Sequence, residues 1–284
     1  MQLPLVFLQG PHKLAMGLNA LDPADWLWLD ERYPAEIAQR AALIAERPTQ
    51  VHAMQPEAAP AAHELLAMVR RHLARHHPDQ ATGPAADGDP PLVTLGRIAQ
   101  EDFCLLQRQD DGAHALTAAI LCFPSHWHLH EKLGRPLAEI HAPVPGFNAR
   151  LGGPADRFLA SLLVERPVWR ANWTLVESPD LFHPQPRETV PDLSSENAGR
   201  RLWLRVERQT LRRLPETRAV VFTIRTLVEP LAAIVRRPGV AAAMAARLRE
   251  MDEAMAGYKG IPALRGPLLA YLERIAEETG AALA

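Results

Sequence analysis

Five segments with the alternating pattern of β-strands follow one another in the middle and later parts of the chain, and their order is what most constrains the fold. Residues 103–108 and 114–123 flank the turn Asp110-Asp111-Gly112, so we expect a hairpin there. Three further strands are predicted at 167–177, 201–212 and 219–228. Most of these strands succeed one another without a helix between them, which favours an antiparallel sheet with helices packed against it, the α+β class.

Helical periodicity is found on both sides of the strand region. Residues 35–46 and 61–76 have helical spacing, and in the second segment one apolar stripe is formed by Leu65, Leu66, Val69 and Leu73. The C-terminal stretch from Pro238 to Glu278 is predicted to be helical, with an interruption near Gly260-Ile261-Pro262. Shorter helices are expected at 126–133 and 154–165.

Proline and glycine mark two long connections. The segment Asp79–Pro91 is rich in turn-forming residues and almost without apolar side chains, so it is predicted to be an exposed loop. Asp180–Gly199 carries four prolines and is predicted to be a second one.

Composition excludes several classes of protein. The net charge of −2 over 284 residues gives no general attraction to nucleic acid or to an anionic membrane. Apolar runs are too short for a helix that spans a bilayer, and the first residues lack the pattern of a signal peptide, so we expect a cytoplasmic protein. The two cysteines, Cys104 and Cys122, cannot supply a Cys₄ iron–sulfur cluster, and they make a disulfide framework or a structural zinc site improbable.

Common catalytic signatures are also absent. The chain has no phosphate-binding GxxxxGK[ST] loop, no GxGxxG and no GxSxG. His63-Glu64 begins like the zinc motif HExxH, but Ala67 stands where the second histidine ligand would be. Zinc-protease chemistry is therefore not expected.

Two histidine segments are candidates for metal binding. In the first, Ser125 is predicted to cap a helix that places His126 and His130 one turn apart, a spacing that can share a metal but more often belongs to a solvated helix face. In the second, His141 precedes the stiff sequence Pro143-Val-Pro145, which would hold its imidazole rigidly. A rigid imidazole suits an axial metal ligand, and a capping or core histidine is the alternative.

Alternation along the later strands gives the predicted sheet one polar face. Trp169 and Trp173 lie on one side of their strand, with Arg170 and Asn172 on the other. In the next strand one face carries Trp203, Arg205, Glu207 and Gln209, and the other carries Leu202, Leu204 and Val206. In the last strand one face carries Val220, Phe222 and Ile224, and the other carries Thr223 and Arg225. Such a face is often simply solvated. Alternatively, Arg170, Arg205 or Arg225 pairs with a ligand's carboxylate and Glu207 attracts a cation.

Five motifs in series carry a family resemblance. They read FPSHW, EKLGRPLAEIHAPVPG, RPVWRANW, LWLRVERQTLRRLP and VVFTIRTLVEPL, and the match is strongest over about residues 95–235. With these motifs the chain resembles the haem-dependent oxidative N-demethylase family, whose best-described members form the haem subunit of dimethylamine monooxygenase.

The resemblance implies a fold and a reaction. It implies one haem-binding PAS-like domain over 1–284, an antiparallel sheet flanked by helices, with helical extensions at about 1–90 and 230–284. The implied reaction removes a methyl group from a small secondary amine with O₂ and two electrons and releases formaldehyde. Electrons are expected from a separate reductase chain that carries FMN, a [2Fe–2S] cluster and NADPH.

Site residues follow from the resemblance in the same way. It implies that His141 is the axial ligand of the haem iron, with Arg170, Arg205, Trp173 and Arg208 as the residues around the cofactor. Among them, Arg170 and Arg205 are expected to pair with the propionates. Glu207 or a tryptophan is expected to bind the amine, with Asn172 as a second catalytic residue.

Two other functions remain open at this point. A haem-based gas or redox sensor would use the same fold, and so would a ligand-binding module without haem, in which His141 is structural.

Overall fold

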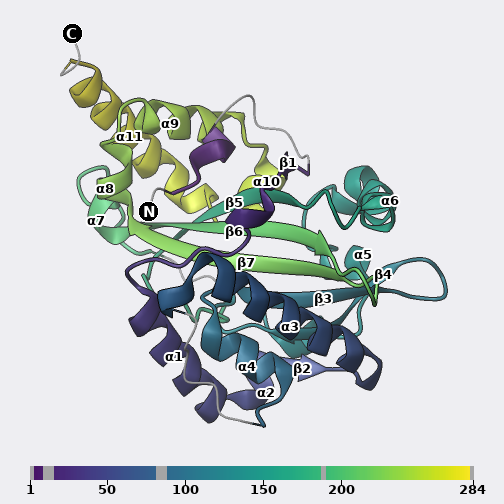
Figure 1. Cartoon of the computed structure of the whole chain (residues 1–284). Coiled ribbons are helices and arrows are strands. Elements are labelled where there is room, and N and C mark those ends of the chain that lie inside the picture. The colour runs from purple at the N-terminus through teal and green to yellow at the C-terminus, as the bar shows by residue number, and fades with distance from the viewer. Residues whose placement is uncertain (1–2, 9–15, 81–87, 187–189, 282–284) are drawn as a thin grey trace.

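The computed structural model describes residues 3–8, 16–80, 88–186 and 190–281, and its centre is a seven-stranded sheet (Figure 1). Its strand order is β1-β5-β6-β7-β3-β4-β2, and every neighbouring pair is antiparallel. The bounds are β1 Asn19–Ala20, β2 His52–Met54, β3 Asp102–Arg108, β4 His114–Ile120, β5 Val168–Val176, β6 Trp203–Arg213 and β7 Val220–Pro230. The α+β prediction and the five predicted strands are therefore confirmed, whereas the short edge strands β1 and β2 were not predicted.

Helices precede and follow the long strands. They are α1 Tyr33–Glu46, α2 Pro48–Val51, α3 Ala59–His76, α4 Pro91–Ile98, α5 Leu137–Ile140, α6 Gly153–Ser161, α7 Ala198–Arg201, α8 Leu231–Val235, α9 Val240–Glu250, α10 Glu253–Tyr258 and α11 Pro262–Ala281. Proline stands in the first turn of α1, α3, α4 and α6, where its missing N–H costs no intrahelical hydrogen bond. The chain's many prolines thus define where helices begin.

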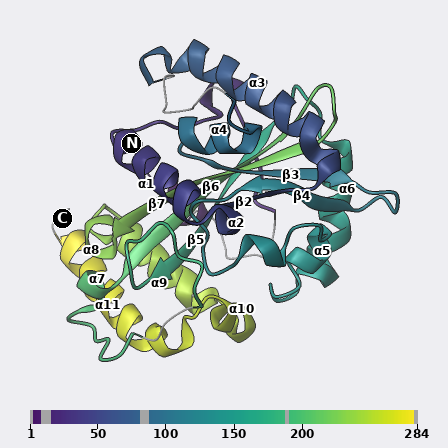
Figure 2. The ribbon, with the colours of Figure 1, turned by 90° about the horizontal axis from the view of Figure 1, so that it is seen from below.

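The two faces of the sheet are covered differently. Phe103, Leu105 and Val221 pack against α1, α3 and α4, whereas Cys104 and Leu106 on the other face pack against Leu137 and Ile140 of α5 and residues of α6. Figure 2 accordingly shows α5 on the side of β3 and β4 opposite to α3 and α4.

The C-terminal helices pack on the far end of the first face. Trp173, Leu204 and Val206 lie in the cluster formed with α8, α9 and α11. By register these side chains share a face with Val221, and strand twist turns the two ends of that face toward different sides of the molecule. The second face of β5 and β6 is therefore covered by the loop that follows β4, in which Phe123 and Pro124 accept hydrogen bonds from Arg205.

The predicted helix at 126–133 is wrong. His126 has a φ of 59°, and Ser125 forms a parallel bridge with His183, so the backbone pairs with a distant segment instead of with itself. One 3₁₀ turn, η5 Leu129–Glu131, remains. His126 and His130 are consequently not one helical turn apart.

The predicted helix at 154–165 ends early, at Ser161. The guanidinium of Arg213 donates to the carbonyls of Leu159 and Leu162, which takes over carbonyls at the C-terminal end of the helix. A tertiary contact from β6 thus fixes where α6 stops.

In the first predicted loop, Asp79 and Gln80 end a 3₁₀ turn, residues 88–90 are loop and Pro91 begins α4, whereas the described part of the second is mostly loop. Residues 81–87 of the first and 187–189 of the second lie outside the described residues. The second loop ends at α7, which begins at Ala198. In the described parts of the chain, no helix is long and apolar enough to cross a membrane.

Candidate active site

A row of polar side chains crosses β5 and β6 on the second face of the sheet. The register pairs Arg170 with Gln209, Asn172 with Glu207, and Thr174 with Arg205. Directly paired residues of antiparallel strands project to the same side, so the predicted polar face is confirmed for β5 and β6. For β7 the prediction was wrong, because Ile224 pairs with Gln209 and Arg225 pairs with Arg208, which puts Arg225 on the opposite face.

Glu207 lies at the middle of this row. The side-chain amide of Gln209 donates to one carboxylate oxygen at 2.9 Å, which fixes the orientation of the group. The carboxylate is close enough to Lys132 and Arg170 for its charge to act on the pKa of both. Cations from the sheet and from the loop after β4 therefore surround one half-buried carboxylate.

His141 follows the last turn of α5 and has a defined tautomer. Its Nδ1 lies 2.9 Å from the carbonyl oxygen of Leu137, and because a carbonyl can only accept, Nδ1 carries the proton. Nε2 is then the nitrogen with an available lone pair. A metal-ligating histidine has the same arrangement, with its other nitrogen donating to a carbonyl or carboxylate.

The charge state of His141 suits a ligand as well. Burial is the main cause that lowers its pKa, and the positive charges of Lys132 and Arg170 lower it further. The imidazole is therefore held neutral near pH 7, the form that binds metals.

The proline-rich turn after His141 holds the ring in place. The amide of Val144 donates to the carbonyl of His141 at 2.9 Å, and Gly146 adopts a φ of 72° that reverses the chain. Phe147 then stacks on the imidazole with the ring centroids 4.4 Å apart and the planes 16° apart. The predicted rigidity of this histidine thus has a geometric basis.

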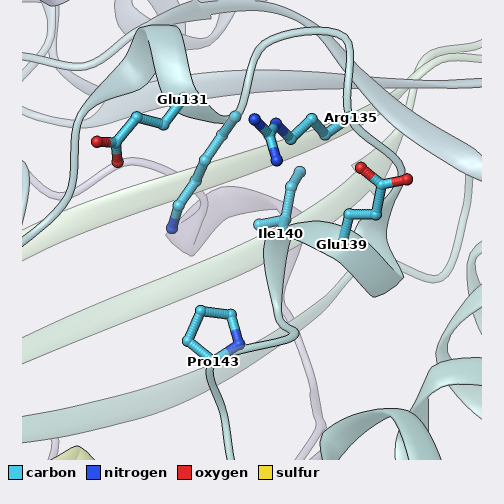
Figure 3. Close-up of a pocket in the computed structure, with 6 residues that line it drawn as sticks. Glu131, Arg135, Glu139, Ile140 and Pro143 are labelled. Atoms are coloured by element: carbon cyan, nitrogen blue, oxygen red, sulfur yellow. The ribbon is translucent and has the colours of Figure 1, made fainter.

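An open pocket of about 370 Å³ is lined by Ile140 and Pro143, which stand on either side of His141 in the sequence. Its lining comes from η5, α5 and the loop between and after them, and consists of Glu131, Lys132, Arg135, Glu139, Ile140 and Pro143. Figure 3 shows the carboxylates of Glu131 and Glu139 on opposite sides of Ile140. The volume lies in the range of small-molecule and cofactor sites.

Arg170 is a half-buried cation without an ion pair among the described residues. Its Nε is buried and has no hydrogen-bond partner there. Burial lowers its pKa, and the carboxylate of Glu207 opposes that shift. An arginine in this state suits an anionic ligand.

Arg205 lies on the same face but is already engaged. Its side chain is 1% exposed, and its two terminal nitrogens donate to the carbonyls of Phe123, Pro124, Asp180 and Leu181 at 2.7 to 3.3 Å. It connects the loop after β4 with the loop after β5, and we do not retain it as a propionate partner.

Arg208 and Trp173 are not brought together with His141. Both project from the first face of the sheet, where Arg208 donates to the Asp25 carboxylate and contacts the rings of Trp28 and Trp169. Trp173 is 5% exposed in the C-terminal core, with the ammonium of Lys259 over its ring.

Arg225 also belongs to the first face. It is buried and pairs with Asp30 at 3.1 Å and with Glu36 at 2.8 Å, so its carboxylate partners come from the chain itself.

The other histidine motifs do not assemble a metal centre. In the described residues, no group of three or more His, Cys, Asp or Glu side chains could hold a metal ion. Glu64 of the incomplete HExxH motif accepts hydrogen bonds from the amides of Glu216 and Thr217, and thereby anchors the β6–β7 turn.

Three contributors near His141 were not predicted. Phe147 stacks on the ring, and Lys132 places its ammonium 4.0 Å from the ring centroid of Trp127. One signal in the sequence was available for Lys132, because the chain has only three lysines among its 31 basic residues.

These features fit a haem. A neutral imidazole offers Nε2 to iron, and a pocket of cofactor size is lined by Ile140, the residue before it. Arg170 supplies an orphaned cationic donor on the sheet beside it.

Comparison with known protein families agrees with this chemistry. A family model described as haem-dependent oxidative N-demethylase, alpha subunit-like, matches residues 17–269. The description names a haem-dependent oxidoreductase reaction, and "alpha subunit" indicates an enzyme of more than one subunit. Since the match covers most of the chain, the protein belongs to the haem-dependent oxidative N-demethylase, alpha subunit-like family.

Proposed function

We propose that this protein is the haem-binding, oxygen-using subunit of an enzyme that removes a methyl group from a small secondary amine such as dimethylamine. The balanced reaction consumes the amine, O₂, two electrons and two protons, and yields the primary amine, formaldehyde and water. The observation that supports it most is His141, whose ring is fixed by Leu137 and Phe147 with Nε2 unprotonated.

His141 would bind the haem iron, and Arg170 would pair with a haem carboxylate. When bound, the haem supplies the activation of O₂, and the protein supplies its position and surroundings. The carbonyl of Leu137 keeps the Nδ1 proton in place, which favours donation from Nε2.

Glu207 is the proposed partner of the amine. An ammonium that leaves water for a half-buried site needs a carboxylate, and Glu207 is held in one orientation by Gln209. Asn172, its cross-strand partner, offers an amide that can donate to or accept from the amine or its product. Oxidation of the methyl group needs the amine near the iron, so Glu207 both binds and orients it.

Electrons must come from another chain in this proposal. With Cys104 and Cys122 both buried and no dinucleotide signature, we expect a reductase that carries FMN, a [2Fe–2S] cluster and NADPH. We further propose that the whole chain is one PAS-like haem domain with helical extensions, and that it acts in the cytoplasm.

The direct test is amine-dependent formaldehyde release by haem-loaded protein with a surrogate reductant. We expect formaldehyde in proportion to dimethylamine consumed. A protein that binds O₂ or CO but releases no formaldehyde with any secondary amine would be a haem sensor, and the proposed reaction would be refuted.

A further inference from the structure

Lys132 is a cation without an anionic partner. Its ammonium lies 4.0 Å from the ring centroid of Trp127, and it forms no ion pair with any described residue. The side chain is half-buried, and burial is the main cause that lowers its pKa. A cation–π contact offsets only part of the desolvation of a charge, and the carboxylates of Glu207 and Glu131 act on the ammonium without forming an ion pair with it.

The location of Lys132 indicates where such an anion would bind. The side chain lines the pocket beside His141, together with Ile140 and Pro143. Its positive charge lowers the pKa of His141, and the carboxylate of Glu207 acts in turn to raise the pKa of Lys132. The anion would therefore lie between the loop after η5 and the polar face of β5 and β6.

Arg170 is the second unpaired cation at the same place. Like Lys132, it lowers the pKa of His141, and the charge of Glu207 acts on it. Arg205, the third cation on this face, is occupied by four backbone carbonyls. The charge of Glu207 acts on both cations and that of Glu131 acts on Lys132, but neither cation forms an ion pair with a described residue, so each can still bind a carboxylate of a ligand.

We propose that Lys132, together with Arg170, binds the two propionate carboxylates of the haem, with Lys132 placed for this contact by the ring of Trp127. This inference rests on the proposed function, since it assumes that His141 holds the iron. The loop from η5 to α5 would then supply both the iron ligand and one propionate partner. Both contacts on one short loop would help to position the cofactor.

The test compares two ligands in optical titrations of Lys132→Met. Hemin carries both carboxylates, whereas hemin dimethyl ester has the same ring and iron without the charges. Loss of one charge-assisted pair should weaken hemin binding about tenfold or more and leave ester binding unchanged. Lys132→Arg should retain most of the affinity for hemin.

The chain provides a matched control. Lys259 lies over the ring of Trp173, 4.9 Å from its centroid, in the C-terminal core. Lys259→Met removes the same type of lysine–tryptophan contact on the opposite face and should bind both ligands like the wild type.

Several results would overturn the inference. Equal weakening of hemin and ester by Lys132→Met would mean that Lys132 only packs, and unchanged hemin binding would mean that it has no role. If the unsubstituted protein bound hemin and its dimethyl ester with equal affinity, the protein would have no binding site for the propionates, and this result would refute the inference by itself. If the unsubstituted protein bound neither ligand, the proposed function itself would fail, a result distinct from failure of Lys132 alone.

Discussion

Replacing Arg205 by methionine tests whether this arginine stabilises the fold or binds a ligand. The side chain is 1% exposed and donates to carbonyls of two loops that are far apart in the sequence. Methionine retains the volume of the aliphatic stem but removes every donor. Buried carbonyls of Phe123 and Pro124 would then lack this partner.

The expected loss follows from the number of donors. Two terminal nitrogens serve four carbonyls, and a hydrogen bond from a charged group contributes about 1.5–3 kcal/mol. The free energy of unfolding should therefore fall by roughly 3–5 kcal/mol, as is usual when one partner of a buried charged contact is removed.

The assay is urea unfolding of protein without added haem, with Arg170→Met as the matched variant. Arg170 stands on the same face, but no described group accepts a hydrogen bond from its Nε. Its replacement should change the free energy of unfolding by about 1 kcal/mol or less and reduce hemin affinity. A loss below about 1 kcal/mol for Arg205→Met would refute the structural role, and so would equal losses for both variants.

Two further predictions concern Glu207 and His72. In the haem-loaded enzyme, Glu207→Gln should raise the KM for dimethylamine about tenfold with haem content unchanged, whereas Glu216→Gln at the end of the same hairpin should not; an unaltered KM for Glu207→Gln would contradict the role of this carboxylate. Burial, aided by the charges of His76, His77 and Arg212, lowers the pKa of His72 from 6.5 to about 4, so the unfolded chain takes up the proton first. The free energy of unfolding should fall by roughly 3 kcal/mol from this group as the pH drops from about 6.5 to 4. His72→Leu should remove that component in pH-dependent urea titrations, and an unchanged pH slope would contradict it.

The strands and their polar face were predictable because the pattern is local. Alternation within each strand depends on neighbours two residues apart, and the register kept the predicted polar side chains of β5 and β6 on one face, whereas it placed Arg225 of β7 on the opposite face. His141 was also accessible from the sequence, since the prolines that follow it act on their own backbone.

Which groups accept hydrogen bonds from each arginine was not predictable in this way. Arg170 and Arg205 alternate into the same face of the sheet, and what distinguishes them is the arrival of two loops over Arg205 alone. Arg208 and Trp173 could have been placed opposite Glu207 from parity. They were instead expected around the cofactor because they stand in motifs that resemble the family.

The helix predicted after β4, at residues 126–133, was wrong for a related reason. Ser125 and Pro124 form a local pattern typical of a helix start, but Ser125 pairs with His183, 58 positions away. The loop that carries Lys132 and His141 is held by another bridge, between Ala115 and Pro136. Long-range contacts of this type leave no periodic signal in a single sequence.

Optical titration with hemin of the unsubstituted protein and of His141→Ala tests the central claim most directly. We expect one hemin per chain with a defined Soret band, and loss or a strong shift of that band in the variant, while His128→Ala leaves it unchanged. Added imidazole should restore a ligated spectrum in His141→Ala. A folded, unsubstituted protein that takes up no hemin would contradict the account, as would a native spectrum in the variant.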